Sequence, residues 1–211
     1  MRPIVFIHGW GLAPSLWSAV IAELDGADCH LVNMGFRGVP QTPMPAAPIV
    51  VGHSMGFAWA LENIPRPWSQ AVAINGFARF SRAPDFPAGI DRRILARMQA
   101  RLADDPGAVT GDFLTRAGLD RPVVNDLDNA ALARHLAWLA DMDMRGPLAT
   151  LDCPILALCG ENDAIVPAPL SAASFPADRI EWITSGDHMA PIKNADLIAS
   201  RLRSLRMGRS S

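Results

Sequence analysis

Three side chains that could carry out nucleophilic catalysis follow one another along the chain in the order serine, carboxylate, histidine. Ser54 lies in GHSMG, Asp163 in the turn after the strand-like run ILALC, and His188 in the turn after IEWIT. A serine hydroxyl is a weak nucleophile unless an imidazole takes its proton, and a buried carboxylate then fixes the tautomer of that imidazole. We therefore assign Ser54 as the nucleophile, His188 as base and then acid, and Asp163 as the orienting acid. Glu161 and Asp187 are competing carboxylates, but Glu161 is nearer the strand end, and Asp187 adjoins the histidine, which usually points the two side chains apart.

The residues around Ser54 predict a tight turn between a buried strand and a helix. The β-branched run IVV at residues 49–51 precedes the turn, and the apolar run FAWAL at residues 57–61 follows it. Gly52 and Gly56 would allow the strand and the helix to pass close together, which leaves the serine hydroxyl exposed at the tip. The alternative is a chance Gly-Ser-Gly turn.

A second glycine-rich turn, HGWG at residues 8–11, follows the first predicted strand. In an architecture with a nucleophile at such a turn, this is where a second donor to the substrate carbonyl oxygen is placed. We expect the backbone N–H groups of Trp10 and Met55 to form this oxyanion hole. The alternative is a plain strand-to-helix turn in which Trp10 belongs to the core.

Strand-like and helix-like runs alternate around these turns, which indicates the α/β class with a mostly parallel sheet of about six strands flanked by helices. The predicted strands are residues 3–7, 29–34, 49–51, 71–75, 155–159 and 180–184, and the helices outside the central region are residues 14–24, 57–61 and 196–205. Four prolines in residues 39–48 disfavour the helix that a parallel crossover usually carries. The polar tail at residues 207–211 is expected to fray.

The central part of the chain predicts helices only. Helical runs at residues 90–102, 108–117 and 130–139 are separated by turns, and no strand-like run interrupts them. We therefore expect a helical cap or lid over residues 77–147, inserted into a core made of residues 1–76 and 148–211.

Composition narrows the function classes further. A chain of 211 residues with a formal net charge of −2 suits one domain and has no general attraction to nucleic acid or anionic membrane. The three cysteines show no metal-ligand spacing, so we expect reduced thiols, no metal and no organic cofactor. With no apolar run of membrane-span length and no secretory leader expected, the sequence favours a cytoplasmic monomer.

With its ordered serine, acid and histidine, the chain resembles the α/β-hydrolase superfamily over essentially its whole length, which implies a minimal version of that fold. The segments HGWGL, GHSMG, DMDMRGPL, GENDAIVP and GDHMAP are similar to those of the pimeloyl-acyl-carrier-protein methyl ester esterases of biotin synthesis. The resemblance implies hydrolysis of a methyl ester on a dicarboxylic acyl chain carried by acyl carrier protein. Attack by Ser54 would expel methanol, and water activated by His188 would release the acid.

The resemblance also implies that lid arginines contact the acidic carrier protein. Arg93, Arg97 and Arg101 recur every fourth residue and would share one helix face, although such a run can equally be a solvated face. Gly111 and Asp112 stand where we would have expected basic residues.

Two alternatives to the carrier-bound ester remain open. One is a general short-chain esterase or lactonase, and the other is a weakly catalytic hydrolase-fold ligand receptor. In the first, the lid would shape an apolar substrate pocket from the aromatic residues Trp10, Phe77, Phe80, Phe113 and Trp138.

Overall fold

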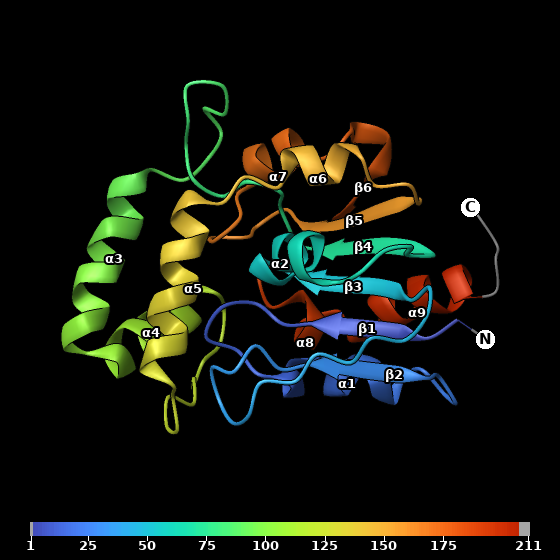
Figure 1. Ribbon diagram of the computed structural model, residues 1–211, viewed down its shortest axis with the longest axis horizontal. Coiled ribbons are helices and arrows are strands. Elements are labelled where there is room, and N and C mark those ends of the chain that lie inside the picture. Colours follow the sequence, from blue (N-terminus) through green and yellow to red (C-terminus); the bar gives the residue numbers. More distant parts are fainter. Residues whose placement is uncertain (1, 207–211) are drawn as a thin grey trace.

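The computed structural model describes residues 2–206, so the tail expected to fray lies outside the described residues. A six-stranded sheet in the order β2-β1-β3-β4-β5-β6 forms the centre, and every neighbouring pair is parallel (Figure 1). This confirms the predicted fold class. The strands are β1 (Ile4–Ile7), β2 (Cys29–Val32), β3 (Ile49–His53), β4 (Gln70–Ile74), β5 (Ile155–Gly160) and β6 (Ile180–Ile183).

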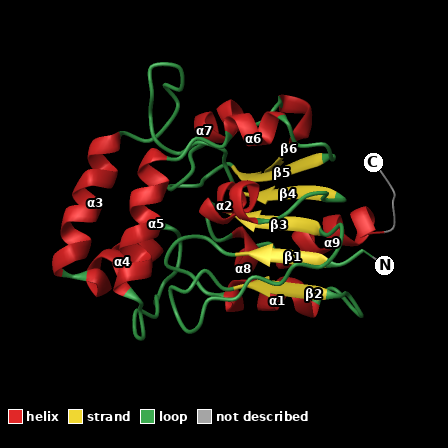
Figure 2. Ribbon diagram, in the orientation of Figure 1, coloured by secondary structure: helices red, strands yellow, loops and turns green. Residues whose placement is uncertain are grey.

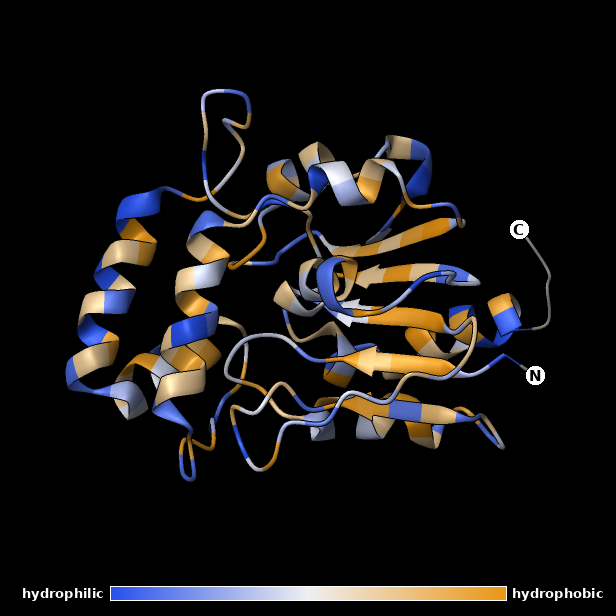
Figure 3. Cartoon of the chain, viewed as in Figure 1, coloured by the Kyte–Doolittle hydropathy of each residue, from blue (hydrophilic) through white to orange (hydrophobic). Residues whose placement is uncertain are grey.

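The inner strands are mainly apolar because helices cover both faces of the sheet. All residues of β1, β3 and β4 are buried, whereas the edge strands β2 and β6 keep partly exposed positions. Figure 3 shows the same contrast as a run of hydrophobic colour along the inner strands. In Figure 2 the carboxyl ends of the strands all meet at one edge of the sheet, where the three candidate catalytic residues follow their strands.

Two groups of helices cover the faces of the sheet. The helix α2 (Met55–Asn63) contacts α6 (Arg145–Ala149) on the face turned toward the viewer in Figure 1, and α7 (Ala168–Ser174) packs on β5. The other face is covered by elements that contact one another: the 3₁₀ segment η1 (Pro14–Trp17) and the helices α1 (Ser18–Ala22), α8 (Ala190–Lys193) and α9 (Ala195–Arg206). A second 3₁₀ segment, η2 (Ala177–Arg179), precedes β6.

The structure corrects one predicted helix in this group. Residues 14–24 do not form a single α-helix, because the segment that begins at Pro14 is a 3₁₀ turn and the α-helix that follows ends at Ala22. Between β2 and β3 the described chain has no helix, as the prolines of residues 39–48 predicted.

Most of residues 77–147, which we call the helical insertion, lie beyond the carboxyl ends of the strands (Figure 1). The insertion contains α3 (Arg92–Asp104), α4 (Pro106–Arg116) and α5 (Asn129–Asp141), and α3 contacts both of the others. Each helix begins after an aspartate whose carboxylate accepts a backbone N–H from the first turn: Asp91 from Arg93 at 2.9 Å, Asp105 from Ala108 at 2.9 Å and Asp128 from Ala131 at 2.8 Å. These caps explain where the three helices start.

The two stems of the helical insertion lie side by side where they join the core. The Met144 N–H donates to the Ala78 carbonyl at 2.7 Å, and Arg79 pairs with Asp143. Among residues 2–206, no helix is long and apolar enough to cross a membrane.

Candidate active site

Ser54 occupies a strained turn between β3 and α2. Its φ of 55° and ψ of −128° are rarely adopted by a residue with a side chain. A Cβ at position 52 would lie 2.6 Å from the Phe57 nitrogen, and one at position 56 would lie 2.7 Å from the Ile7 carbonyl oxygen. Both glycines are therefore required for the close approach of strand and helix.

Asp163 and His188, which follow β5 and β6, are in contact with each other. Asp163 Oδ2 is 2.7 Å from His188 Nδ1, and its Oδ1 accepts the N–H groups of Ile165 at 2.7 Å and Val166 at 2.8 Å. The histidine side chain is 1% exposed and the aspartate side chain is fully buried. A serine triad needs two hydrogen bonds, one between serine and histidine and one between histidine and the acid. Among the described residues, the bond between His188 and Asp163 is formed. The bond between serine and histidine often tightens only in the substrate complex.

The two competing carboxylates face elsewhere. The Glu161 carboxylate accepts the Ser185 N–H at 3.3 Å and is exposed. The Asp187 carboxylate accepts the Met189 N–H at 2.9 Å and pairs with Lys193, so neither reaches the ring of His188.

His53, the residue before Ser54, packs against the candidate base. The two rings have centroids 4.8 Å apart, and His53 Nε2 lies 2.8 Å from the His188 carbonyl oxygen. A carbonyl can only accept, so Nε2 carries the proton. Burial, followed by the charge of His188, holds the pKa of His53 well below its usual value. His53 is therefore a neutral donor and not a second base.

The turn at residues 8–11 packs directly on the serine turn. A Cβ at Gly9 would lie 3.1 Å from Ser54 Cβ. His8 Nε2 accepts the Met34 N–H at 3.2 Å, which leaves Nδ1 to donate to the Gly9 carbonyl at 2.9 Å. Met55 is the first residue of α2, so its N–H has no acceptor within that helix. This arrangement brings the two expected oxyanion turns together, and the Trp10 indole N–H donates to the Leu132 carbonyl of α5 at 3.0 Å.

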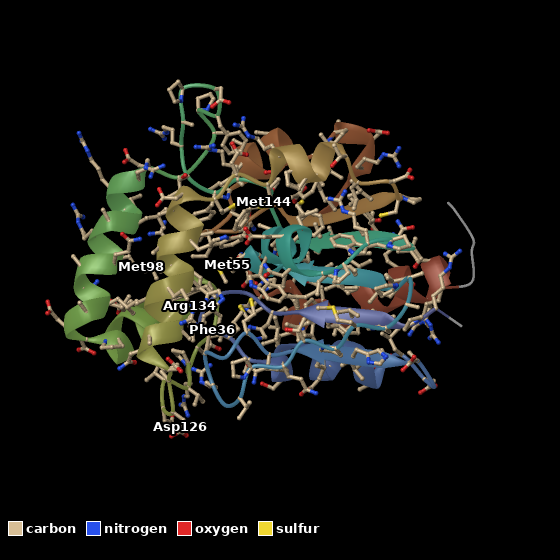
Figure 4. All side chains as sticks on the ribbon, viewed as in Figure 1. Phe36, Met55, Met98, Asp126, Arg134 and Met144 are labelled. Carbon is tan, nitrogen blue, oxygen red and sulfur yellow. The ribbon has the colours of Figure 1, made fainter. Side chains whose placement is uncertain are left out.

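A cavity of about 300 Å³ lies between these turns and the helical insertion, and Ser54 lines it. Figure 4 labels two of its lining residues, Met55 at the start of α2 and Met98 on α3. Of the aromatic residues predicted for the pocket, the structure places four along the cavity: Trp10, Phe77, Phe80 and Phe113. The floor is therefore polar at the serine while the walls are mainly apolar.

Trp138 was predicted for this pocket and does not line it. Leu136 and Leu139 present the cavity face of α5 instead, and Trp138, only one residue before Leu139, is turned by about 100° from it around the helix. Leu95 and Met98 of α3 also line the cavity and were missed. Their spacing of three residues on an amphipathic helix was the available signal.

Exposed charged residues stand where the cavity meets solvent. Arg97, Arg101 and Arg116 all line it, and Arg101 pairs with Asp112 at 2.9 Å. Arg93, the third member of the predicted docking face, is exposed but does not line the cavity. The cavity thus joins an apolar interior to a mouth with three cations and one anion.

The sequence is similar to those of known proteins over most of its length. The sequence profile described as the alpha/beta hydrolase family matches residues 36–201. The pimeloyl-[acyl-carrier protein] methyl ester esterase of Xanthomonas campestris is 28% identical, over 94% of this chain and 92% of that protein. The biotin biosynthesis bifunctional protein BioHC of Cellvibrio japonicus is also 28% identical over 79% of this chain, but the match spans only 39% of its length.

Solved structures share the fold at low sequence identity. The bromoperoxidase of Bacillus anthracis superposes with a TM-score of 0.81 over 98% of this chain and 92% of that one, at 18% identity. The enol-lactonase of Burkholderia xenovorans gives a TM-score of 0.76 over 98% and 92% of the two chains, at 13% identity.

Proposed function

The chain belongs to the alpha/beta hydrolase family, and from this premise we propose that it is a serine carboxylesterase. The observation that carries the proposal is the buried Asp163–His188 pair at 2.7 Å, together with a strained serine that lines a mainly apolar cavity. In this proposal the catalytic residues are Ser54, Asp163 and His188, and residues 77–147 act as the lid of the site.

The reaction would proceed through an acyl-enzyme. His188 Nε2 takes the proton from Ser54 Oγ as the oxygen attacks the ester carbonyl, and Asp163 holds the imidazole in the required tautomer. The backbone N–H groups of Trp10 and Met55 donate to the developing oxyanion. His188 then protonates the departing alcohol, and a water molecule activated by the same ring hydrolyses the acyl-serine ester.

We propose the methyl ester of a dicarboxylic acyl chain on acyl carrier protein as the substrate. Two features support this choice: the names of the esterase relatives, and a cavity whose apolar walls suit an acyl chain while its mouth carries Arg97, Arg101 and Arg116. Cations at the mouth would favour a negatively charged carrier protein by electrostatic steering. A general short-chain esterase is the second candidate, since Asp112 already pairs with Arg101 and reduces the positive charge available there.

The first test compares hydrolysis of methyl-pimeloyl acyl carrier protein with that of free dimethyl pimelate. We expect the wild type to prefer the carrier-bound ester, and Ser54→Ala to fold while losing turnover of both. Equal activity on the free ester would keep the serine mechanism and exclude the carrier protein as a partner. Absence of turnover on either ester would favour a ligand receptor.

A second test addresses the arginines. Replacing Arg93, Arg97 and Arg101 by glutamine should raise KM for the carrier-bound ester and leave the free ester nearly unaffected. Arg179→Gln is a matched control, because this exposed arginine lies in η2, which precedes β6 at the opposite end of the sheet. An unchanged KM in the triple variant would show that these arginines do not contact the carrier.

A further inference from the structure

The side chain of Asn75 links the candidate acid loop to the candidate base loop. Asn75 directly follows β4, the strand between the serine strand β3 and the acid strand β5. The carbonyl of the preceding residue, Ile74, accepts the Ser54 N–H at 3.0 Å, and the Asn75 N–H donates to the Leu158 carbonyl of β5 at 2.9 Å. Asn75 therefore has a backbone fixed between the nucleophile turn and the neighbouring strand.

The conformation of Asn75 turns its side chain across the ends of the strands. Its φ is 48°, a region that asparagine tolerates better than most residues, and it is only 1% exposed. A buried amide in this position must find partners for its oxygen and for both of its N–H groups.

All three requirements are met by backbone groups of the two catalytic loops. Asn75 Oδ1 accepts the Gly160 N–H at 2.7 Å, at the point where the chain leaves β5 for Asp163. Asn75 Nδ2 donates to the Asp187 carbonyl at 2.9 Å and to the His188 carbonyl at 3.2 Å. An N–H group only donates and a carbonyl only accepts, so the orientation of the amide is determined by its partners.

Side-chain N–H groups hold the backbone of the loop that carries His188. The His188 carbonyl receives one bond from Asn75 and a second from His53 Nε2 at 2.8 Å, while its ring is held by Asp163 at 2.7 Å. Asn75 and His53 therefore hold the backbone of the base in place, and Asp163 orients its ring.

We propose that Asn75 is a positioning residue, which sets the distance of the His188 ring from Ser54 and Asp163 by bonding both loops with one amide. The inference rests on the proposed esterase function. No other common side chain of this size offers one acceptor and two donors. An aspartate would face two carbonyl oxygens with its carboxylate and push the loop away.

The test uses two substitutions at this position and one in β4, the strand that precedes it. Asn75→Gly keeps the positive φ without strain and removes the amide, so its effect reports the side chain alone. Asn75→Asp keeps the shape and the acceptor but lacks the donors, and it serves if the glycine variant does not fold. Gln70→Ala removes another buried polar side chain at the opposite end of β4, which makes it a matched control for stability.

We expect kcat to fall about 100-fold in either Asn75 variant with KM within about twofold, because a misplaced base affects the chemical step more than binding. The strongly downfield proton resonance of a histidine bonded to a carboxylate, here His188 Nδ1–H, should shift or disappear. Gln70→Ala should retain kcat and this resonance even if its Tm falls. A folded Asn75 variant with kcat within threefold of the wild type and an unchanged resonance would overturn the inference.

Failure of the proposed function gives a different pattern. In that case the wild type itself hydrolyses none of the esters. The proton resonance requires no turnover, so it still decides whether Asn75 positions His188.

Discussion

The buried neutral His8, the first residue of the turn at residues 8–11, should make the stability of this protein sensitive to mild acid. Burial, opposed by the bond to the Gly9 carbonyl, lowers the pKa of His8 from its ordinary 6.5 to about 4. Between these two values the unfolded chain binds a proton at His8 that the folded chain does not. The unfolding free energy therefore falls as the pH falls from about 6.5 to about 4. Above this window His8 is neutral in both the folded and the unfolded chain, so its ring lowers the stability no further.

The size of the effect follows from the shift. A difference of about 2.5 pKa units corresponds to roughly 3 kcal/mol, at about 1.4 kcal/mol per unit. His53 is also buried and its pKa is also lowered, so the wild type alone would show a larger loss. The difference between the wild type and His8→Gln isolates the contribution of one ring.

The assay is denaturant-induced unfolding, followed by tryptophan fluorescence, at intervals from pH 7.5 to 4. The stability advantage of the wild type over His8→Gln should shrink by about 3 kcal/mol across this range. Thr110→Val, which replaces a buried residue that does not titrate, should differ from the wild type by a constant amount. A His8→Gln difference that stays constant to within about 0.5 kcal/mol would refute the reasoning, since the smallest effect expected from the shift is several times larger.

Three further substitutions test the site and the fold. Asp163→Asn should lower kcat about 10⁴-fold, because the backbone donors at Oδ1 would hold the amide oxygen and present the NH₂ group to His188, forcing the wrong tautomer; a loss below tenfold in ester hydrolysis would contradict this. Gly56→Ala should reduce the unfolding free energy by about 3 kcal/mol in urea titrations, because the added Cβ would clash with the backbone at the end of β1. An unfolding free energy equal to that of the wild type would contradict this. Trp10→Phe removes the indole donor to Leu132, so amide hydrogen exchange in α5 should become faster, and unchanged exchange would mean that this bond does not hold the helix.

Much of the core could be predicted because its signals are local. Short strand-like runs identified all six strands, and the prolines of residues 39–48 correctly predicted that no helix lies between two of them. The predicted helix at residues 14–24 is longer than the observed one, because apolar spacing does not distinguish a 3₁₀ turn from an α-helix. The short helices α6, α7 and α8 lacked enough residues to show a periodicity.

The candidate site could likewise be predicted only in part. The order of serine, acid and histidine was visible in the sequence, and the Asp163–His188 contact agrees with it. The role we infer for Asn75 was not visible, because its partners are 85 to 113 residues away and are backbone atoms of loops. The face of α5 that lines the cavity was likewise ambiguous, since Trp138 and Leu136 are both apolar positions on one half-buried helix.

The paired stems of the helical insertion are points at which the insertion could be exchanged for that of a relative. The insertion leaves and re-enters the core at adjacent points joined by the Ala78–Met144 bond, so cutting at both stems removes α3, α4 and α5 without breaking a strand. A segment exchanged there would need to recreate bonds to the core away from the stems, among them the Leu132 carbonyl for Trp10, the Val123 carbonyl for Arg37 and the Asp128 N–H for the Phe36 carbonyl. If residues 77–147 act as the lid we propose, such an exchange would replace much of the cavity wall in one step, while the strands followed by Ser54, Asp163 and His188 stay untouched.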